Sequence, residues 1–392
     1  MRIAVTGLGV VSALGVGVDR NFAALAAEQS GISPEPRILR SAHRLPVGEL
    51  KLTNEELHRM CGVELKEHLS RTALLGILAV REAIEDARLA SDARVGLVSA
   101  TSVGGMDLTE HFFEEFMADE RRGRLRDVRM HDCAASTEAI AAHCHIRGYC
   151  TTISTACSSS ANAILQGLKL LRHGILDAVV VGGTDALSAF TLNGFKSLMI
   201  LDEAPCRPFD ASRRGLNLGE GAGYLVLQRE GEHARDPYCY VAGAANSNDA
   251  HHQTASSEEG NGALLAMQGA LQMAGIDPSA VDYVNVHGTG TGNNDLSEGR
   301  ALLRLFGDRV PAFSSTKGFT GHTLAAAGGI EAVYSALAIA RGVRYANLRF
   351  ETPIAEHGLV PEKHHQTACA VSTVLSNSFG FGGNCSSVLF TK

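Results

Sequence analysis

The chain has 392 residues, of which 45% are apolar and 20% charged, and its formal net charge is −7. This length predicts two or three domain-sized units or one large α/β body. The mild negative charge, without long basic blocks, argues against a protein whose main partner is nucleic acid. The 42 glycines are scattered through apolar segments, which excludes a linker or a disordered chain and indicates tight turns and close backbone approaches.

Cysteine usage and hydropathy predict a cytoplasmic protein. The nine cysteines are an odd number and form no C-x-x-C pair, and the chain is far longer than a disulfide-stapled module. Residues 1–17 are apolar like a signal peptide, but their glycines suit a strand and turn better. No uninterrupted apolar run reaches the roughly 18 residues of a membrane span, so we expect none.

Apolar runs bounded by glycine alternate with segments of helical periodicity along the whole chain. The predicted strands are residues 2–6, 94–100, 151–155, 178–182, 223–228, 281–287, 312–315 and 386–391. The predicted helices are residues 74–88, 158–173, 262–274 and 325–341. Such alternation favours an α/β fold with buried sheets.

The two halves of the chain show a weak internal repeat. Residues 73–75 and 263–265 both read Ala-Leu-Leu at the start of a predicted helix, and a strand with a glycine-rich turn follows each. Further on, strand–loop–helix units carry Cys157 in one half and Lys317 in the other. A duplicated α/β core is the favoured interpretation; the alternative is chance similarity between two ordinary αβ units.

Cys157 is the strongest candidate for chemistry. It lies in the segment TACSSS, between a β-rich run and a helix rich in Ala and Leu. At a helix N-terminus the dipole and free N–H groups favour the thiolate, which predicts a lowered pKa and a nucleophile. The alternative is a buried small thiol, the interpretation that we keep for the other eight cysteines.

Two glycine-rich loops follow predicted strands. The first, HGTGTG from His287, exposes backbone and hydroxyl groups where ligands collect in α/β sheets; the alternative is a plain turn. The second, KGFTGH, begins at Lys317 and ends at His322, and leads into a small-residue helix that carries Glu331. Glu331 could pair with Lys317, and a Lys and a His at a helix entrance can polarise a carbonyl or take up negative charge.

The remaining motifs are weaker. Residues 378–384, SFGFGGN, place Phe379 and Phe381 in a glycine-rich bend that is either a mobile lid or a packed turn. Residues 7–12 are an incomplete dinucleotide fingerprint. The His and Cys residues between 131 and 145 lack zinc-site spacing, so we expect no metal site.

Taken in this order, the motifs resemble those of the β-ketoacyl-acyl-carrier-protein synthases, the elongating Cys-His-His type of the thiolase superfamily. The resemblance runs from VTGLG near the N-terminus to the terminal GFGG, and includes RPFD at residues 207–210 and GEGAG at residues 219–223. It implies a five-layered αβαβα thiolase fold of two similar halves. Residues 1–235 would carry the nucleophile, and residues 236–392 the two histidines and the lysine.

The resemblance assigns roles to five residues. Cys157 matches the nucleophile that accepts the acyl chain from carrier protein. His287 and His322 match the histidines that promote decarboxylation of malonyl-carrier protein and stabilise the enolate. Lys317, with Glu331 as its partner, matches the structural and electrostatic lysine.

Substrate contacts also have counterparts in the family. Phe381 matches the gating aromatic, and the N–H groups of Phe381 and Cys157 would form the oxyanion hole. Thr289 and Thr291 match residues that contact the pantetheine arm. Phe379, beside the gate, is also expected to bind substrate.

Several positions depart from the family pattern. Gly292 stands where proline is common, Arg214-Gly215 where Asp-Gly is, and Asn384-Cys385 in place of Thr-Asn. These changes leave the catalytic set intact and alter the fine shape of the acyl pocket. Residues 206–223 and the compact length are more similar to condensing subunits of discrete polyene-type systems than to housekeeping elongation enzymes.

An acidic carrier protein requires a local basic surface on this acidic chain. Five arginines lie within residues 121–129 with one acidic neighbour. The residues expected to dock the carrier are Arg121, Arg122, Arg124 and Arg207. The alternative is a solvated charged loop.

The predicted function is decarboxylative Claisen condensation of malonyl-acyl-carrier protein with an acyl chain held as a Cys157 thioester, in fatty acid or polyketide biosynthesis. The alternative is a ketosynthase subunit of a type II polyketide or aryl-polyene pathway, paired with a chain-length-factor subunit. A non-catalytic partner subunit ranks last because Cys157 is present. No cofactor is expected, because phosphopantetheine arrives on the carrier, and the dimer partner is a second copy or a homologous chain-length factor.

Overall fold

The computed structural model describes residues 2–41, 43–90 and 93–392. In the first half, the main strands are β1 (Ile3–Ser12), β5 (Val95–Ala100), β6 (Cys150–Ile153), β7 (Ala178–Asp185) and β8 (Gly221–Arg229). In the second half they are β9 (Cys239–Asn248), β10 (Tyr283–Asn285), β11 (Ala312–Ser314), β12 (Thr373–Phe379) and β13 (Asn384–Thr391). Three short strands, β2 (Gly15–Val16), β3 (Ile32–Ser33) and β4 (Val47–Gly48), lie near the N-terminus.

The two halves have the same sheet topology. The hydrogen-bonded order is β11-β10-β12-β13-β9-β1-β8-β7-β5-β6. From the β1–β9 junction outward, each half therefore runs first, fifth, fourth, second and third strand in chain order. The two outer pairings are parallel and the two inner pairings antiparallel in both halves. The expected duplication of an α/β core is therefore visible in the strand order.

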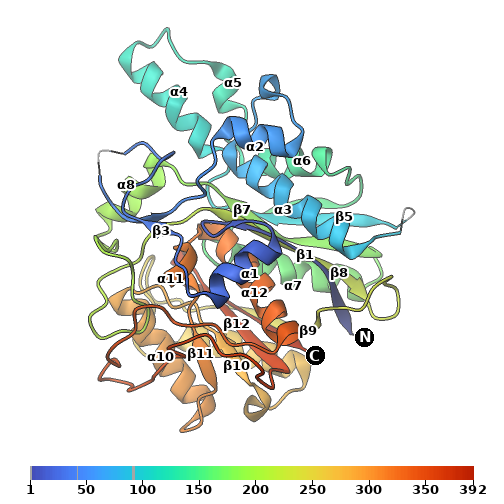
Figure 1. Cartoon of the computed structure of the whole chain (residues 1–392), viewed down its shortest axis with the longest axis vertical. Helices are drawn as coiled ribbons and strands as arrows, with labels where there is room; N and C mark the ends of the chain where they lie inside the picture. The colour runs from blue at the N-terminus through green and yellow to red at the C-terminus, as the bar shows by residue number, and fades with distance from the viewer. Residues whose placement is uncertain (1, 42, 91–92) are drawn as a thin grey trace.

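Helices form three layers around these strands (Figure 1). One outer layer contains α3 (Arg71–Ala87) and α6 (Cys133–His143), and the other contains α9 (Asn261–Ala274) and α10 (Gly292–Phe306). Between the two five-stranded halves of this sheet lie α7 (Ser159–Arg172) and α12 (Ala327–Arg341). The remaining helices are α1 (Val18–Ala26), α2 (Asn54–Cys61), α4 (Met106–Ala118), α5 (Leu125–Val128), α8 (Ala189–Ser197) and α11 (Lys317–Thr320). This is the five-layered αβαβα arrangement that the resemblance implies.

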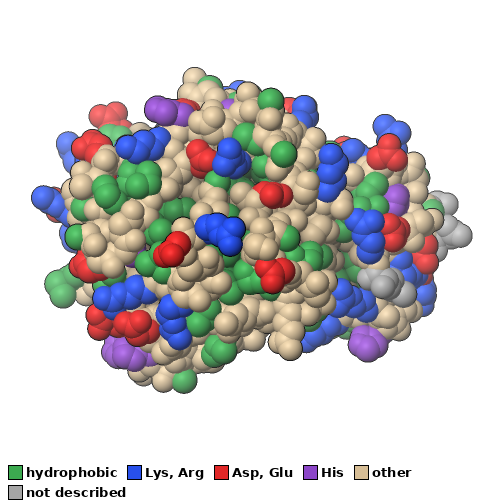
Figure 2. Space-filling model, turned by 90° about the horizontal axis from the view of Figure 1, so that it is seen from below, with side chains coloured by type: hydrophobic (Ala, Val, Ile, Leu, Met, Phe, Trp, Pro, Cys, Tyr) green, Lys and Arg blue, Asp and Glu red, His purple; other side chains and the backbone are tan. Residues whose placement is uncertain are grey.

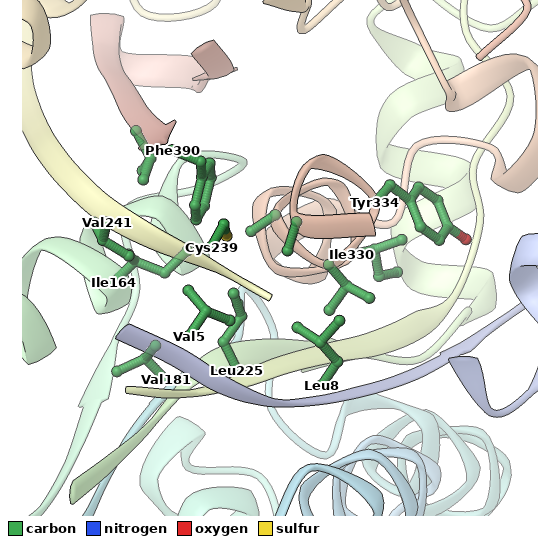
Figure 3. Packing of buried hydrophobic residues seen from close by; sticks show 14 of the residues in the cluster. Val5, Leu8, Ile164, Val181, Leu225, Cys239, Val241, Ile330, Tyr334 and Phe390 are labelled. Atoms are coloured by element: carbon green, nitrogen blue, oxygen red, sulfur yellow. The ribbon is translucent and has the colours of Figure 1, made fainter. Parts of the chain in front are cut away.

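Side chains alternate between the two faces along each strand, which explains why helices cover both faces of the sheet in each half. On β7, Val179 and Val181 pack in the central core, whereas Ala178 and Val180 pack against the outer helices. Successive strand residues point to opposite faces, so an all-apolar strand needs a helical layer on each side. Figure 3 shows the central core, where Ile330 of α12 lies close to residues of β1 such as Leu8.

The central helix α12 is apolar over most of its surface, with Glu331 and Ser335 as its buried polar side chains. With the preceding 3-10 turn η3 (Leu324–Ala326), it forms an 18-residue segment that is long and apolar enough to cross a membrane, although the sequence predicted no such segment. However, 89% of this window is buried inside the protein. A helix that is hydrophobic all round is typical of the core of a large protein, and that position accounts for its composition here.

The sequence prediction missed the strands β9 and β12 and several helices, among them α1, α2, α4, α6, α8 and α10. The strands β9 and β12 both contain Ser and Asn among their apolar residues, and β9 also contains Gly, which hides their period. The bend predicted at residues 378–384 is the tight connection between β12 and β13, in which Phe379 pairs with Cys385. The helix α10 begins with the polar sequence Gly-Asn-Asn, which favours a turn, but Thr291 caps it by accepting the Asn294 N–H.

Surface charge is mixed on the face shown in Figure 2, where acidic and basic side chains are interspersed.

The helices α4 and α5 project from the body at the top of Figure 1. These two helices carry exposed apolar side chains, among them Phe113 at 58% and Met117 at 67% on α4 and Leu125 at 80% on α5. Large apolar side chains gathered on a projecting element indicate a surface that another molecule covers.

Candidate active site

A cavity of about 240 Å³ brings together seven of the predicted site residues. It lies where the N-terminus of α7 meets the loops that follow β10, β11 and β12. Its lining includes Cys157, His287, Thr289, Thr291, His322, Phe379 and Phe381. The halves of the chain thus contribute different groups to one site, with the cysteine from the first half and both histidines from the second.

Cys157 lies on a sharp turn between β6 and α7. Ala156 has a left-handed backbone, with φ 53°, a conformation that is uncommon for a residue with a side chain. The turn is held by hydrogen bonds from the Thr155 N–H to Ser159 Oγ at 2.8 Å and from Ser158 Oγ to the Thr155 carbonyl at 2.7 Å. Ser158 Oγ also lies 2.6 Å from Asn384 Oδ1, a contact that ties the turn to β13.

The expected lowering of the Cys157 pKa is wrong. The side chain is 6% exposed, and burial raises the pKa of the thiol to about 12. The Lys317 ammonium and the N–H groups of Phe381 and Cys157 act in the opposite direction without overcoming burial. The thiol is therefore protonated at neutral pH, because desolvation disfavours the charged form more than the helix terminus stabilises it.

His287 and His322 face each other across the cavity. Their ring centroids are 5.3 Å apart, with an interplanar angle of 87°. Burial, reinforced by the Lys317 charge, lowers the pKa of His322 to about 3 and holds the pKa of His287 well below its usual range. Both rings are therefore neutral at pH 7. His322 Nδ1 accepts the Leu324 N–H at 3.0 Å, so the proton of its neutral ring is on Nε2.

The loop that carries His287 is held by two buried carboxylates that the sequence interpretation missed. Glu298 accepts the N–H groups of His287 and Gly288, both at 2.9 Å, and Asp295 accepts the Thr289 N–H at 3.0 Å. Burial raises the pKa of Glu298 to about 7, although these hydrogen bonds oppose the rise. The available signal was their spacing of three residues on the helix directly after the loop, which places both on one face.

Lys317 and Glu331 lie behind the cavity and do not line it. Lys317 Nζ donates to Glu331 Oε1 at 2.5 Å and to the His287 carbonyl at 2.6 Å. Their side chains are 1% and 3% exposed. Burial raises the pKa of the Glu331 carboxyl, and the neighbouring ammonium opposes that rise. The pair therefore contacts the histidine loop through the backbone and acts on the cavity through its charge.

Phe381 closes one side of the cavity. It begins the 3-10 turn η4 (Phe381–Gly383), and its ring stacks on Phe195 with centroids 5.6 Å apart. Phe195 comes from α8 and was not predicted. Gly380 packs closely next to it, because a methyl group there would lie 3.0 Å from the Thr155 oxygen and 3.1 Å from the Cys157 nitrogen. This close approach brings the Phe381 N–H to the Cys157 sulfur.

The other predicted groups lie outside the cavity. Arg121, Arg122 and Arg124 belong to the segment between α4 and α5, where Arg121 pairs with Asp119 at 3.1 Å. Arg207 lies apart from them, beside Gly290 of the histidine loop. Within the described parts of the chain, no group of three or more His, Cys, Asp or Glu side chains is arranged to hold a metal ion.

The fold has five layers and two similar halves, and its cavity places one cysteine opposite two neutral histidines. Together these features define a thiolase-like condensing enzyme. Family models for the N-terminal and C-terminal domains of β-ketoacyl synthase match residues 1–233 and 238–351. The chain belongs to the β-ketoacyl synthase family and is an acyltransferase of the condensing type.

Three relatives show how far the similarity extends. The 3-oxoacyl-[acyl-carrier-protein] synthase 2 of Staphylococcus aureus strain MRSA252 is 33% identical, over 100% of this chain and 98% of its own. The ishigamide ketosynthase/chain length factor structure has a TM-score of 0.92 at 27% identity, covering 100% and 99% of the two chains. A ketosynthase from Xenorhabdus doucetiae, solved with its chain length factor, has a TM-score of 0.87 at 31% identity, covering 100% and 98%.

Proposed function

We propose that this protein condenses malonyl-acyl-carrier protein with an acyl chain held as a thioester on Cys157, releasing CO₂ and a β-ketoacyl product. The observation that supports this most directly is the shared cavity, in which the buried thiol and two neutral histidines face the same space. The named relative in Staphylococcus aureus is a synthase of this kind.

The first half-reaction is acyl transfer to the cysteine. The Cys157 sulfur forms a bond to the acyl carbon, the bond to the pantetheine sulfur breaks, and the thiol proton passes to the departing pantetheine sulfur. The N–H groups of Cys157 and Phe381, which point to the sulfur, donate to the oxyanion of the tetrahedral intermediate. Rigid backbone donors of this kind stabilise developing charge without rearranging.

The second half-reaction is decarboxylation and condensation. Loss of CO₂ from the malonyl group leaves an enolate, whose oxygen accepts hydrogen bonds from His322 Nε2–H and from His287. The enolate carbon forms a bond to the acyl carbon, the bond from that carbon to the Cys157 sulfur breaks, and the sulfur takes up one proton from solvent water. Because both histidine pKa values are depressed, the rings donate hydrogen bonds and remain neutral, so the carbanion is not quenched by proton transfer.

Lys317 acts through its charge and its backbone contact. It donates to the His287 carbonyl, which orients that residue, and its ammonium lowers the pKa values of Cys157 and both histidines.

The reaction as proposed uses no metal or organic cofactor of the enzyme, because the reactive thioesters and the pantetheine arm both arrive on the carrier protein. The cytoplasm is the proposed compartment.

A second thiolase-fold subunit is the proposed partner at the projecting face. A mostly apolar cavity of about 370 Å³ lies between α4 and α8, and Phe113, Phe190 and Met199 are 58%, 57% and 89% exposed. A second copy of the chain or a homologous chain-length factor would cover these side chains. Chain length factors accompany the two similar ketosynthase structures, which favours a type II polyketide or polyene pathway as the second candidate.

The exposed arginines 121, 122 and 124, with Arg207, are proposed to dock the acidic carrier.

The test of the main proposal is an intact-mass assay of acyl loading followed by malonyl-dependent extension. The wild-type protein, purified with any partner subunit, should gain the mass of one acyl group and release an extended β-ketoacyl product. Cys157→Ala should do neither, while Cys150→Ala, a change at an exposed thiol, should leave both intact. Extension by Cys157→Ala at the wild-type rate would contradict the mechanism.

A further inference from the structure

The cavity changes character between its floor and its mouth. Cys157, His287 and His322 are 6%, 2% and 2% exposed and form the buried end. At the other end the lining is exposed to solvent and includes Arg214 and Asn293. A ligand long enough to reach the buried thiol therefore has its outer end beside these polar side chains.

Among the described residues that line the cavity, Arg214 is the only arginine, and none of the others is a lysine, an aspartate or a glutamate. The two histidines of the lining are neutral at pH 7. In residues 2–41, 43–90 and 93–392, no carboxylate lies within ion-pair distance of its guanidinium. By contrast, Arg300 of α10 is paired with Glu258 and Glu259. Arg214 therefore supplies the one uncompensated charge in this cavity.

The neighbouring arginines are already engaged with the protein. Arg213 donates to the carbonyl oxygens of Thr291 at 3.2 Å and Gly292 at 2.9 Å, and Arg207 donates to Ser212 Oγ at 3.1 Å. Arg213 thereby fastens this segment to the histidine loop. On the other side, the Leu216 N–H donates to the Ile200 carbonyl at 2.9 Å. Arg214 is held between two fixed points at the mouth, and among the described residues none accepts a hydrogen bond from its guanidinium.

We propose that Arg214 binds the phosphodiester at the outer end of the pantetheine arm and makes the enzyme select phosphorylated arms. This inference rests on the proposed function, which brings that arm past Thr289 and Thr291 to Cys157. A guanidinium offers a planar fork of donors that matches two phosphate oxygens. The neutral interior and the charged mouth thus match a ligand that is neutral along its length and anionic at its end.

The test compares thioester donors that differ only beyond the pantetheine hydroxyl. Hexanoyl-pantetheine and hexanoyl-phosphopantetheine are each reacted with the whole protein, and acylation of Cys157 is followed by intact mass. In this step the bond from the acyl carbon to the pantetheine sulfur breaks, the bond to Cys157 forms, and the proton passes to the pantetheine thiol. We expect wild type to prefer the phosphorylated donor by about tenfold, since hydrogen bonds to charged groups are the strong ones.

Variants assign the preference to this side chain. The ratio of the Cys157 acylation rates with the two donors should fall close to one in Arg214→Gln and be intermediate in Arg214→Lys. Arg300→Gln, which removes the same charge from a paired arginine, should keep the wild-type ratio. Competition by free phosphopantetheine against free pantetheine measures the same selectivity as binding, without turnover. The inference about Arg214 is overturned if Arg214→Gln prefers the phosphorylated donor as strongly as wild type does, or if wild type shows no preference. Either result leaves the proposed function intact.

Two other outcomes are informative. If neither donor acylates wild-type Cys157, the proposed function fails and the inference fails with it. Hexanoyl-coenzyme A offers the same phosphate chemistry with additional phosphates. A coenzyme A rate well above the phosphopantetheine rate, lost in Arg214→Gln, would assign the arginine to the nucleotide end and overturn the assignment to the phosphodiester of the arm.

Discussion

Lys317 Nζ donates a 2.6 Å hydrogen bond to the main-chain carbonyl of His287. This contact joins the two glycine-rich loops of the second half, one following β10 and the other following β11. The same ammonium is held from behind by Glu331. A single buried cation therefore fixes the position of one histidine and contributes to the low pKa of both.

Removing either member of this pair should destabilise the protein strongly. Lys317→Met leaves Glu331 buried without its cation, and Glu331→Leu leaves the ammonium without its anion; each change should cost about 3–5 kcal/mol of unfolding free energy. The double variant replaces both charges by apolar side chains and should recover much of this loss. Thermal unfolding of the three variants measures it. A double variant less stable than either single one would contradict a charge-pair explanation.

Malonyl decarboxylation should be strongly reduced in that double variant even though its stability returns. The backbone contact to His287 and the positive charge behind the cavity are both absent, so the histidines lose a cause of their low pKa. The measurement is malonyl decarboxylation by the refolded or stabilised double variant, with the thermal midpoint as its control.

Alkylation of Cys157 should depend steeply on pH. Because the folded-state pKa is raised to about 12, the thiolate is a small fraction at pH 7 and grows about tenfold per pH unit up to the pKa. The rate of iodoacetamide modification, followed by peptide mass, should therefore still be rising at pH 10. In the unfolded protein the same thiol should level off near its ordinary pKa of about 8.5. A plateau below pH 8 in the folded protein would mean that the helix terminus outweighs burial.

Gly380→Ala should slow acylation of Cys157. The added methyl group would meet the Thr155 oxygen at 3.0 Å and the Cys157 nitrogen at 3.1 Å, so the turn that carries the thiol and the N–H donors must shift. We expect at least a tenfold loss of acylation rate, about 1.4 kcal/mol. Gly292→Ala is the matched control, because a methyl group there meets nothing within 4 Å. Equal rates for the two variants would show that the close approach at residue 380 is unimportant.

The sequence was most informative where reactive residues follow strands in short motifs. Cys157, His287 and His322 could be predicted because strand-to-helix loops in α/β folds meet at one edge, and the structure brings all three to one cavity. The raised Cys157 pKa could not be predicted, because it depends on burial by segments far apart in the chain. Strand β12, with Ser and Asn inside its run, was missed for a related reason: all of its residues are buried, so polarity does not mark a solvent face.

The buried carboxylates of α10 were the main omission at the site. An acidic residue on a helix normally faces solvent, so the three-residue spacing of Asp295 and Glu298 places them on one face of α10 without showing that this face is buried. Only the fold shows that Glu298 receives two backbone N–H groups and the Asn377 side chain.

Glu298→Gln should therefore separate the two half-reactions. The amide keeps one acceptor but turns an NH₂ group toward a backbone donor, which removes a charge-assisted hydrogen bond worth about 1.5–3 kcal/mol. Because this bond orients the His287 loop, malonyl decarboxylation should fall by about 10- to 100-fold, whereas hexanoyl transfer to Cys157, which does not use His287, should stay within about threefold of wild type. Glu258→Gln, a change at the exposed partner of Arg300, should alter neither rate. An equal loss in both half-reactions would indicate general unfolding of the site and would remove the positioning role from Glu298.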